Sequence, residues 1–460
     1  MKLKALLWVV VLLCSLHLNI SLAIGKPGFT EIFSSDEQGA TALDATDPLS
    51  FYRKKFLIPT NDEGQEPIYL NGHVMGLAPV EAQSYMISEI NEWAKKASEK
   101  RYEGDNPWYS FHEKLKGSFA KLLGAMPEEI VLMNSLSTNL HLAMISFYKP
   151  TKSRFKIVME APLYVADLFI VKSQLKLHGL DPEEALIVVE PDPNIKFLRL
   201  EDFERVFAEN RDSIALVFIS KINHLTGQVM DTESLTKLAH ANGAMVGLNL
   251  AHAVGNIKLK LHKNDVDFAA WCNYKYMSGG PGAVGGLFIH KRHVGNPQLH
   301  RLAGWWGSDP QTRFKDDKAR EFIPMVSADA WQPSEPQVFS MVPLQASLKI
   351  FDEVGIDAYR EKSIRLTSYL EYLIDYVHAE EVEIITPRDI NQRGAQISLL
   401  ISRNAENFYK TLQQRRIICD FKAPNIIRVA PVPFYNSYHD VWNFVNVLSE
   451  FFKGKPIEKL

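Results

Sequence analysis

Lys275 is the residue of this sequence whose position best suits covalent chemistry. It follows the apolar run DFAAWCN (residues 267–273) and lies between Tyr274 and Tyr276. A lysine is usually a solvated surface charge, but one that follows a buried strand lies where open α/β sheets bind their ligands. Burial at such a position lowers the pKa of the amine, which makes it a nucleophile toward carbonyl groups. We therefore expect a Schiff-base lysine at position 275, with a solvated lysine as the alternative.

The segment around Lys275 also contains a G-x-G-x-x-G pattern, formed by Gly280, Gly282 and Gly285. In a dinucleotide-binding turn, this pattern follows a strand and opens a helix whose N-terminus holds the pyrophosphate. Here it leads into GAVGGLFIHK, which is an apolar run with β character. The pattern therefore does not predict nucleotide binding, and we expect the glycines to permit a tight turn or a close backbone approach.

Polar residues lie at two other expected strand ends. MNSLSTNLH runs from a strand end into a helix start, where Ser135 and Ser137 suit helix capping and the free amides suit a phosphate group. In GLNLAHAVGN, Asn249 ends a strand and His252 follows three residues later. A partly buried, hydrogen-bonded histidine without chemistry is the alternative for His252.

A metal site is not expected from the histidines of HKRHVGNPQLH. His290, His293 and His300 have no carboxylate or cysteine beside them at the spacing of metal ligands. Metal binding is therefore not part of the prediction.

Strands and helices are predicted to alternate from about residue 67 to residue 300. Short apolar runs indicate the strands, and helical periodicity follows most of them: strands over 128–134, 154–161, 213–220, 244–251 and 267–273, and helices over 137–148, 164–179 and 232–243. Such alternation implies a mainly parallel sheet covered by helices on both faces.

The chain divides into four predicted segments. Residues 1–23 have two lysines, an apolar run and a small-residue cleavage pattern, which is typical of a secretory signal peptide cleaved near Ala23. Residues 24–66 are read as an N-terminal arm, and 67–334 as a large domain. Residues 335–460 are read as a smaller α+β domain, which opens with one long helix over 345–377.

Composition and charge limit the function further. The 460 residues carry a net charge of −3 and show no basic stripe, which argues against nucleic-acid binding. Only Cys272 and Cys419 lie outside the predicted signal, so a disulfide framework is excluded. The mature chain is expected to be secreted and free of stable membrane insertion. Membrane anchoring by an uncleaved signal is the alternative.

Several sequence blocks together resemble kynureninase, a fold-type-I pyridoxal 5′-phosphate (PLP) enzyme of the class-V aminotransferase superfamily. The similarity extends from YLNGHVMGLAP (69–79) to IIRVAPVPFYNSYHDVWNF (426–444) and includes MNSLSTNLHL, LAHAVGN, DFAAWCNYKY and GWWGSDPQTRF. It implies a large domain with a mainly parallel, seven-stranded sheet, a smaller C-terminal domain and a homodimer.

The resemblance also implies roles for individual residues. Lys275 would carry PLP, and Tyr274 would contact the phosphate and assist proton transfer. Arg428 would hold the substrate α-carboxylate in a bidentate contact, which suits a guanidinium group. The remaining positions would bind the cofactor, with Leu136 and Ser137 at its phosphate, Tyr164 stacked on its ring, Asp167 and His252 at the polar edge of the ring, and Trp305 at the phosphate of the partner subunit.

This sequence departs from the family pattern at the cofactor and at the substrate. Asn249 replaces an aspartate that pairs with the pyridine nitrogen, and this loss weakens the ring as an electron sink. On the substrate side, the chain has Val74 for serine, Arg101 and Ser308 for histidines, and Glu335 for asparagine. A polar pocket that loses matched donors rejects its former substrate.

The implied activity is PLP-dependent hydrolysis of the Cβ–Cγ bond of L-kynurenine or 3-hydroxykynurenine, which yields alanine and anthranilate from kynurenine. A reduced rate or an altered substrate is compatible with the departures. Two alternatives stay open: a PLP enzyme for a different amino acid, and a secreted binding protein of this family without catalysis.

Overall fold

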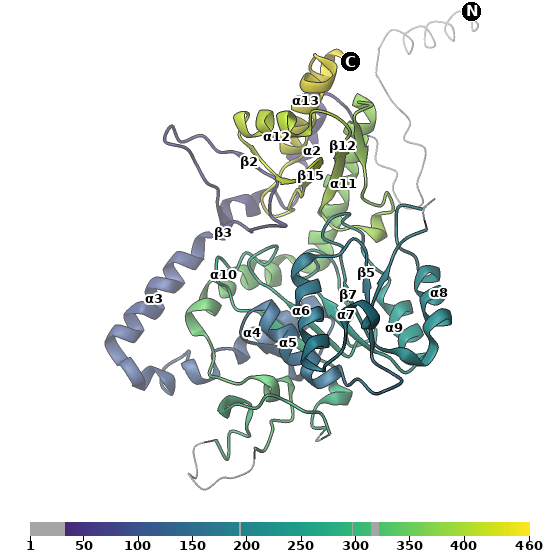
Figure 1. Cartoon of the computed structure of the whole chain (residues 1–460). Coiled ribbons are helices and arrows are strands. Elements are labelled where there is room, and N and C mark those ends of the chain that lie inside the picture. The colour runs from purple at the N-terminus through teal and green to yellow at the C-terminus, as the bar shows by residue number, and fades with distance from the viewer. Residues whose placement is uncertain (1–32, 193–194, 297, 314–321) are drawn as a thin grey trace, which may run out of the picture.

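The computed structural model describes residues 33–192, 195–296, 298–313 and 322–460 (Figure 1). The predicted signal peptide, residues 1–23, and the first part of the predicted arm lie outside the described residues.

A seven-stranded sheet forms the centre of the larger part of the chain. Its order is β4-β10-β9-β8-β7-β5-β6, and the strands are β4 (Ile130–Leu132), β5 (Lys156–Glu160), β6 (Leu186–Val189), β7 (Ile214–Ser220), β8 (Met245–Asn249), β9 (Phe268–Trp271) and β10 (Gly286–Ile289). The pairs from β6 through β9 are parallel, whereas β10 is antiparallel to both β9 and β4. The predicted α/β fold with a mainly parallel sheet is confirmed.

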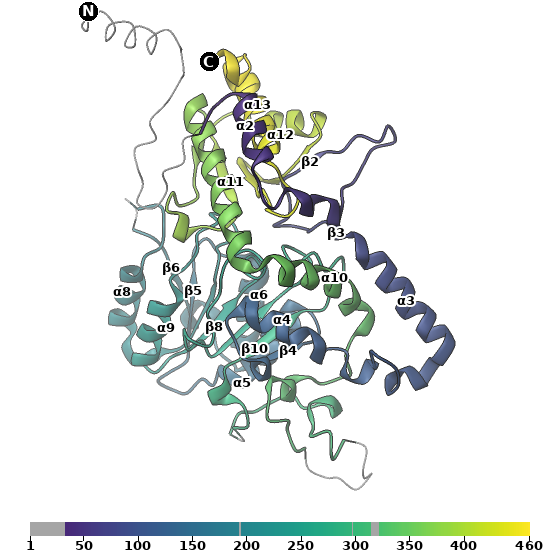
Figure 2. The same ribbon diagram turned by 180° about the vertical axis from the view of Figure 1, so that it is seen from behind.

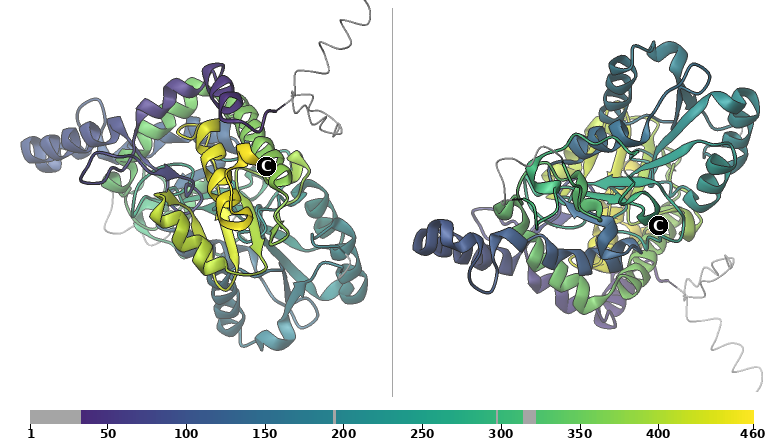
Figure 3. Two further views of the ribbon diagram at one scale, coloured as in Figure 1. Left: turned by 90° about the horizontal axis from the view of Figure 1, so that it is seen from above. Right: turned by 90° about the horizontal axis from the view of Figure 1, so that it is seen from below.

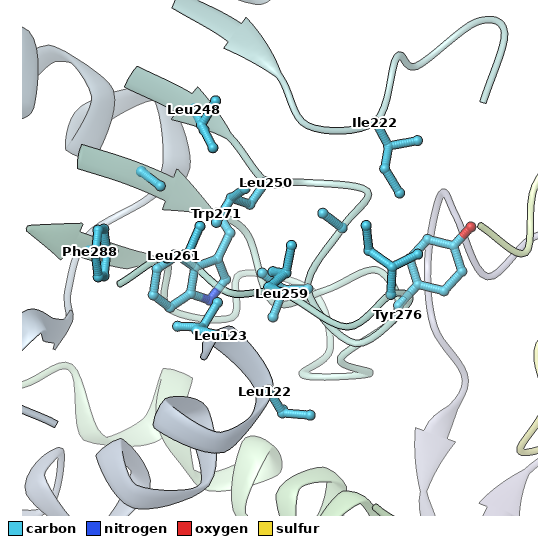
Figure 4. Close-up of a cluster of buried hydrophobic side chains, with 14 of the residues drawn as sticks. Leu122, Leu123, Ile222, Leu248, Leu250, Leu259, Leu261, Trp271, Tyr276 and Phe288 are labelled. Atoms are coloured by element: carbon cyan, nitrogen blue, oxygen red, sulfur yellow. The ribbon is translucent and has the colours of Figure 1, made fainter. Parts of the chain in front are cut away.

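Helices cover both faces of this sheet because its strands are apolar on both faces. In β4, for example, Leu132 packs with one hydrophobic cluster and Val131 with another. The first cluster contains residues of α4 (Glu113–Leu123), α8 (Leu200–Asn210) and α9 (Thr232–Ala241), and the second contains residues of α5 (Leu136–Phe147) and α6 (Val165–Leu177). Figure 4 shows Trp271 of the sheet beside Leu123 of α4. The two cores thus pack the sheet between these helices.

A smaller unit contains a four-stranded antiparallel sheet and a separate hydrophobic core. The strand order is β11-β12-β15-β14, with β11 (Val382–Ile384), β12 (Ile397–Ile401), β14 (Asp420–Lys422) and β15 (Ile426–Val429). Its helices are α11 (Ile356–Val377), α12 (Ala405–Gln414) and α13 (Tyr438–Lys453). This unit lies at the top of Figure 1 and is seen from behind in Figure 2.

The long helix expected over 345–377 is two helices in the structure. α10 (Val338–Val354) ends at Gly355, whose φ of 75° breaks the helix, and α11 follows directly. α10 packs in the core of the large sheet, whereas α11 packs in the core of the small unit. The expected division at residue 335 therefore differs from the packing, because α10 belongs to the large unit.

The N-terminal segment contributes to the small unit. α2 (Glu37–Ala45) packs on α13, and Phe33 and Leu70 are buried in the core of the small unit. β2 (Ile68–Tyr69) pairs in parallel with β13 (Ile417–Ile418). The predicted arm, residues 24–66, therefore contributes Phe33 and α2 to the small unit.

α3 (Val80–Lys96) follows the short pair β1 (Phe56–Leu57) and β3 (Ala78–Pro79). It packs along α10 and projects from the body of the chain (Figure 3). Ile87, Ile90 and Trp93 of this helix are exposed apolar side chains.

Within the described ranges, no helix has both the length and the apolar content needed to cross a membrane.

Candidate active site

Lys275 lies in the turn that follows β9, at the carboxyl edge of the large sheet. Asn249 ends the neighbouring strand β8, and the two strands are parallel with Asn249 opposite Ala270. The Nζ atom of Lys275 is 2.8 Å from Nε2 of His252, which lies in the loop after β8. Burial lowers the pKa of Lys275, and the positive charge of Arg428 acts in the same direction. The structure thus places this lysine where the strand pattern predicted a reactive amine.

His252 is buried and uncharged. Burial lowers its pKa well below the usual range, and the neighbouring Lys275 charge lowers it further. A neutral imidazole accepts one hydrogen bond, and here its Nε2 accepts from the lysine amine. Its Nδ1 has no hydrogen-bond partner among the described residues. An unpaired buried nitrogen of this kind is available to a bound molecule.

Asp167 and Asn249 form a buried carboxylate–amide pair beside Lys275. Nδ2 of Asn249 donates to both carboxylate oxygens of Asp167, at 2.9 and 2.8 Å, and its Oδ1 accepts from the backbone N–H of Ala251. Burial raises the pKa of Asp167 to about 6, although the hydrogen bond from Asn249 and the charge of Lys275 oppose this effect. The single carboxylate of the pair therefore comes from α6, not from the end of β8.

The raised pKa of Asp167 predicts a pH-dependent stability in the chain without cofactor. Between the unfolded pKa of 3.8 and the folded pKa of about 6, the folded state binds more protons, so stability falls as pH rises. The shift between these two pKa values corresponds to about 3 kcal/mol in the free energy of unfolding. Asp167→Asn removes this dependence, so we expect the variant to gain stability relative to the wild type between pH 4 and pH 7. Urea unfolding of both proteins across this range measures the difference; parallel curves would contradict the assignment.

The N-terminus of α5 presents exposed polar groups at the same edge of the sheet. β4 runs in the same direction as β9, since β10 is antiparallel to both, and α5 starts just after β4. The hydroxyls of Ser135 and Thr138 are 3.0 Å apart, and Ser135, Ser137 and Thr138 are all exposed. The first-turn amides of α5, which include those of Leu136 and Ser137, lack intrahelical acceptors and suit a phosphate group.

Arg428 joins the small unit to this edge. It lies on β15 with its side chain buried; its Nε donates to Asp420 at 2.7 Å, and its Nη1 donates to the carbonyl oxygen of His224 at 2.5 Å. His224 lies in the loop after β7, and its ring centroid is 5.1 Å from that of the exposed Tyr164. These contacts hold the guanidinium group over the carboxyl edge with further N–H groups available.

Tyr274 precedes Lys275, and the loop that carries Val74 contacts the same turn. Burial raises the pKa of Tyr274, and its ring centroid is 5.9 Å from Nζ of Lys275. Val74 is in the loop of residues 71–76, and the N–H of Gly76 in this loop donates to the carbonyl oxygen of Tyr274. The structure therefore brings Tyr274 and the loop that carries Val74 to the Lys275 turn.

Four other predicted positions, Arg101, Glu335, Trp305 and Ser308, form a separate group. Arg101 pairs with Glu335, and both line a cavity of about 300 Å³. The exposed ring of Trp305 packs edge-on against Trp306, and Ser308 donates to the carbonyl oxygen of Trp305. The cavity walls are largely aromatic and include Trp93, Trp108, Tyr109, Trp306 and Phe339. The contacts described for Arg101 and Glu335 involve neither Lys275 nor Asp167. Within a single chain, the cavity residues and the Lys275 site are therefore not joined by these contacts.

The structure places a carboxylate beside the histidines of residues 290–300, which the sequence did not suggest. Ligand atoms of Glu129, His262 and His290 lie within 4.8 Å of one another. Oε1 of Glu129 already accepts from His262 and from the N–H of Lys291, and the two imidazole rings stack in parallel at 4.9 Å. Parallel rings do not direct both nitrogens at one ion, so we interpret this group as a hydrogen-bond network.

Sequence reasoning missed two histidines near Lys275. His224 follows β7 by four residues, so its position after an apolar run was a usable signal. His73 lies in a glycine-containing loop far from any predicted strand end, and no local pattern indicated it. Its ring centroid is 6.3 Å from that of His252.

Comparisons with known proteins decide the family. A kynureninase of Myxococcus xanthus is 45% identical over 417 residues, which cover 91% of this chain and 97% of the relative. The chain belongs to the kynureninase family. A second relative, a kynureninase of Koribacter versatilis, is 43% identical over 90% of this chain and 97% of its own length. The family model described as the kynureninase C-terminal domain matches residues 359–448.

Solved structures agree on the fold. An apo cysteine desulfurase from Thermococcus onnurineus matches with a TM-score of 0.70 and 20% identity, over 88% of this chain and 98% of its own. A C-DES mutant with glycine covalently linked to its PLP cofactor matches with a TM-score of 0.68 and 14% identity, over 83% of this chain and 96% of its own. The predicted fold of a fold-type-I PLP enzyme is therefore confirmed.

Proposed function

We propose that this chain is a PLP-dependent hydrolase that cleaves the Cβ–Cγ bond of L-kynurenine or 3-hydroxykynurenine and releases L-alanine. Identity of 45% to a kynureninase over nearly the full length carries this conclusion. The arrangement of Lys275, the Asp167–Asn249 pair and Arg428 at one edge of the sheet supports it.

The residues at this edge fit PLP. A nucleophilic amine, an exposed helix N-terminus and a buried carboxylate match the aldehyde, the phosphate and the ring nitrogen of the cofactor in turn. Lys275 would hold the aldehyde carbon, the α5 amides of Leu136 and Ser137 would hold the phosphate together with Tyr274, and Tyr164 would cover a ring face. The unpaired Nδ1 of His252 also fits a bound ligand, since its burial without a partner is unfavourable.

Bound at this site, PLP supplies an electron sink for the bonds at the substrate α-carbon. Lys275 moves the α-proton, because burial lowers the pKa of its amine and so favours the neutral, basic form. His252 accepts a hydrogen bond from the same amine and therefore orients it. Asp167 would supply a carboxylate at the polar edge of the ring, whereas the amide of Asn249 carries no charge to hold a proton on the ring nitrogen.

Arg428 would bind the α-carboxylate of the substrate. Its contacts with Asp420 and the His224 carbonyl fix the plane of the guanidinium group before any ligand binds. A preorganised group of this kind orients the substrate at little entropic cost.

Asn249→Asp is expected to raise turnover with saturating PLP by roughly ten- to hundredfold. A carboxylate at this position adds a charge-assisted hydrogen bond at the cofactor. The new carboxylate also lies against Asp167, so in the chain without cofactor the two groups share a proton and stability falls. Steady-state kinetics on kynurenine measure the gain, with Asn249→Ala as the uncharged comparison. A fall in turnover would mean that the amide is adapted to this chemistry.

The substrate-side departures favour one second candidate, a PLP reaction on a different amino acid. The Arg101–Glu335 ion pair places two charges in an aromatic cavity where the family has neutral or titratable groups. Anthranilate fluorescence and cofactor absorbance after addition of L-kynurenine distinguish the candidates. Anthranilate release establishes hydrolysis, whereas a cofactor signal without anthranilate favours a different amino acid or a binding protein.

Assembly and localisation complete the proposal. A homodimer would bring Trp305 and the Arg101–Glu335 group of one protomer to the Lys275 site of the other, which explains why one chain keeps these groups apart. Sedimentation of the purified protein tests the dimer.

Residues 1–23 would direct the chain to secretion. N-terminal sequencing of protein from the medium tests cleavage near Ala23. An intact N-terminus on cytosolic protein would contradict secretion.

A further inference from the structure

His73 is a fully buried imidazole within the candidate site that has no assigned role. Its exposed fraction is 0%, and neither ring nitrogen has a hydrogen-bond partner among the described residues. A buried unpaired polar group costs stability, so two on one ring call for an explanation. The ring lies 6.3 Å from that of His252, which contacts Lys275 directly.

The loop that carries His73 is fixed on both sides. Asn71 forms a β-bridge with Ala430, next to the strand that carries Arg428. At the other end, the N–H of Gly76 donates to the Tyr274 carbonyl at 2.9 Å, and a Cβ at Gly76 would lie 2.3 Å from the carbonyl oxygen of Lys275. The position of His73 between the carboxylate-binding arginine and the reactive lysine is therefore built into the backbone.

Burial and the surrounding charges together favour the neutral form of the His73 ring. Burial lowers its pKa well below the usual range, and the positive charges of Arg428, Lys275 and Lys422 lower it further. A neutral imidazole offers one N–H donor and one nitrogen acceptor. Because Arg428 serves the substrate carboxylate, the neutral His73 ring can pair with an uncharged polar group instead.

We propose that His73 hydrogen-bonds the side-chain carbonyl group of the bound amino acid. This inference rests on the proposed hydrolase function, in which water adds to that carbonyl. The substrate has three polar groups near the reacting bonds: its carboxylate, which faces Arg428, its amine, which Lys275 serves, and this carbonyl. His73 is a buried donor with no partner among the described residues, so it can serve the third group, and its N–H stabilises the charge that develops on the carbonyl oxygen.

Replacement of His73 tests the inference on the PLP-loaded enzyme. His73→Ala and His73→Phe remove both ring nitrogens, and we expect kcat/KM for L-kynurenine to fall roughly ten- to hundredfold. His73→Gln restores an amide donor and is expected to recover part of the loss. His290→Gln is the matched control, because His290 is also buried but follows β10 at the opposite edge of the sheet.

A binding measurement separates a substrate contact from a structural role. L-Phenylalanine has the carboxylate and amine but no side-chain carbonyl, so its spectroscopic Kd at the cofactor is expected to be the same in wild type and variants. The Kd for kynurenine is expected to rise in His73→Ala and His73→Phe. Equal losses for both ligands, or unchanged kinetics in an active enzyme, would overturn the inference. Failure of the wild type itself to bind or hydrolyse kynurenine would instead overturn the proposed function.

Discussion

Lys275→Ala abolishes hydrolysis and removes the absorbance of lysine-bound PLP. The variant lacks both the amine that holds the aldehyde and the base that moves the α-proton, so we expect turnover to fall by at least roughly a thousandfold. Absorbance spectra with added PLP, followed by the anthranilate assay, measure both effects.

The matched control for this variant is Lys258→Ala. Lys258 is an exposed lysine that pairs with Asp357 on the surface, so its loss is expected to leave both signals unchanged. Retained cofactor absorbance in Lys275→Ala would show that a different lysine carries PLP. Loss of both signals in the two variants alike would point to a general effect of lysine removal.

Arg428→Gln lowers kcat/KM for kynurenine by roughly a hundred- to a thousandfold while PLP binding persists. The glutamine amide cannot replace a bidentate ionic contact with the carboxylate, and a buried charged hydrogen bond contributes about 1.5–3 kcal/mol for each partner. The loss appears mainly in KM if the contact exists before the transition state, and in kcat if it orients the substrate.

Arg403→Gln is the control for Arg428→Gln. Arg403 lies in the same unit, but its side chain is exposed and pairs with Glu381 on the surface. Because Arg428 also pairs with Asp420, a urea unfolding curve shows whether Arg428→Gln acts on the site or on stability. Unchanged kinetics in a stable Arg428→Gln variant would assign the carboxylate to another group.

The sequence predicts those parts of the fold that depend on local patterns. The runs over 244–251 and 267–273 are apolar on both faces, and buried parallel strands have that pattern, so both strands were predicted, although each ends two residues earlier, at Asn249 and at Trp271. Lys275 follows from the same pattern because ligands bind beyond such ends. By contrast, the break at Gly355 was missed, since apolar residues continue on both sides of it.

The contacts that complete the site are not local. Asp167 meets Asn249 only because α6 and β8 pack at one edge, and Arg428 meets Asp420 and the His224 carbonyl from three segments of the chain. The two-residue strand β2 is too short for any periodicity, and its pairing with β13 depends on tertiary packing. Long-range packing therefore determines which side chains contact one another in the site. Periodicity predicts only which residues lie at the carboxyl edge of the sheet.

The interleaving of the two chain ends has a consequence for synthesis. Residues 33–45 and 68–70 emerge from the ribosome early, yet the surfaces that bury them, on α11, α13 and β13, are made much later. The strands of the large sheet lie within residues 130–289, so that sheet is complete in sequence long before the small unit. Apolar residues such as Phe33 and Leu70 therefore remain exposed to solvent during translation, when nascent chains are most prone to aggregate. A truncated chain that stops before α13 is expected to depend on chaperones, even though its large sheet is intact.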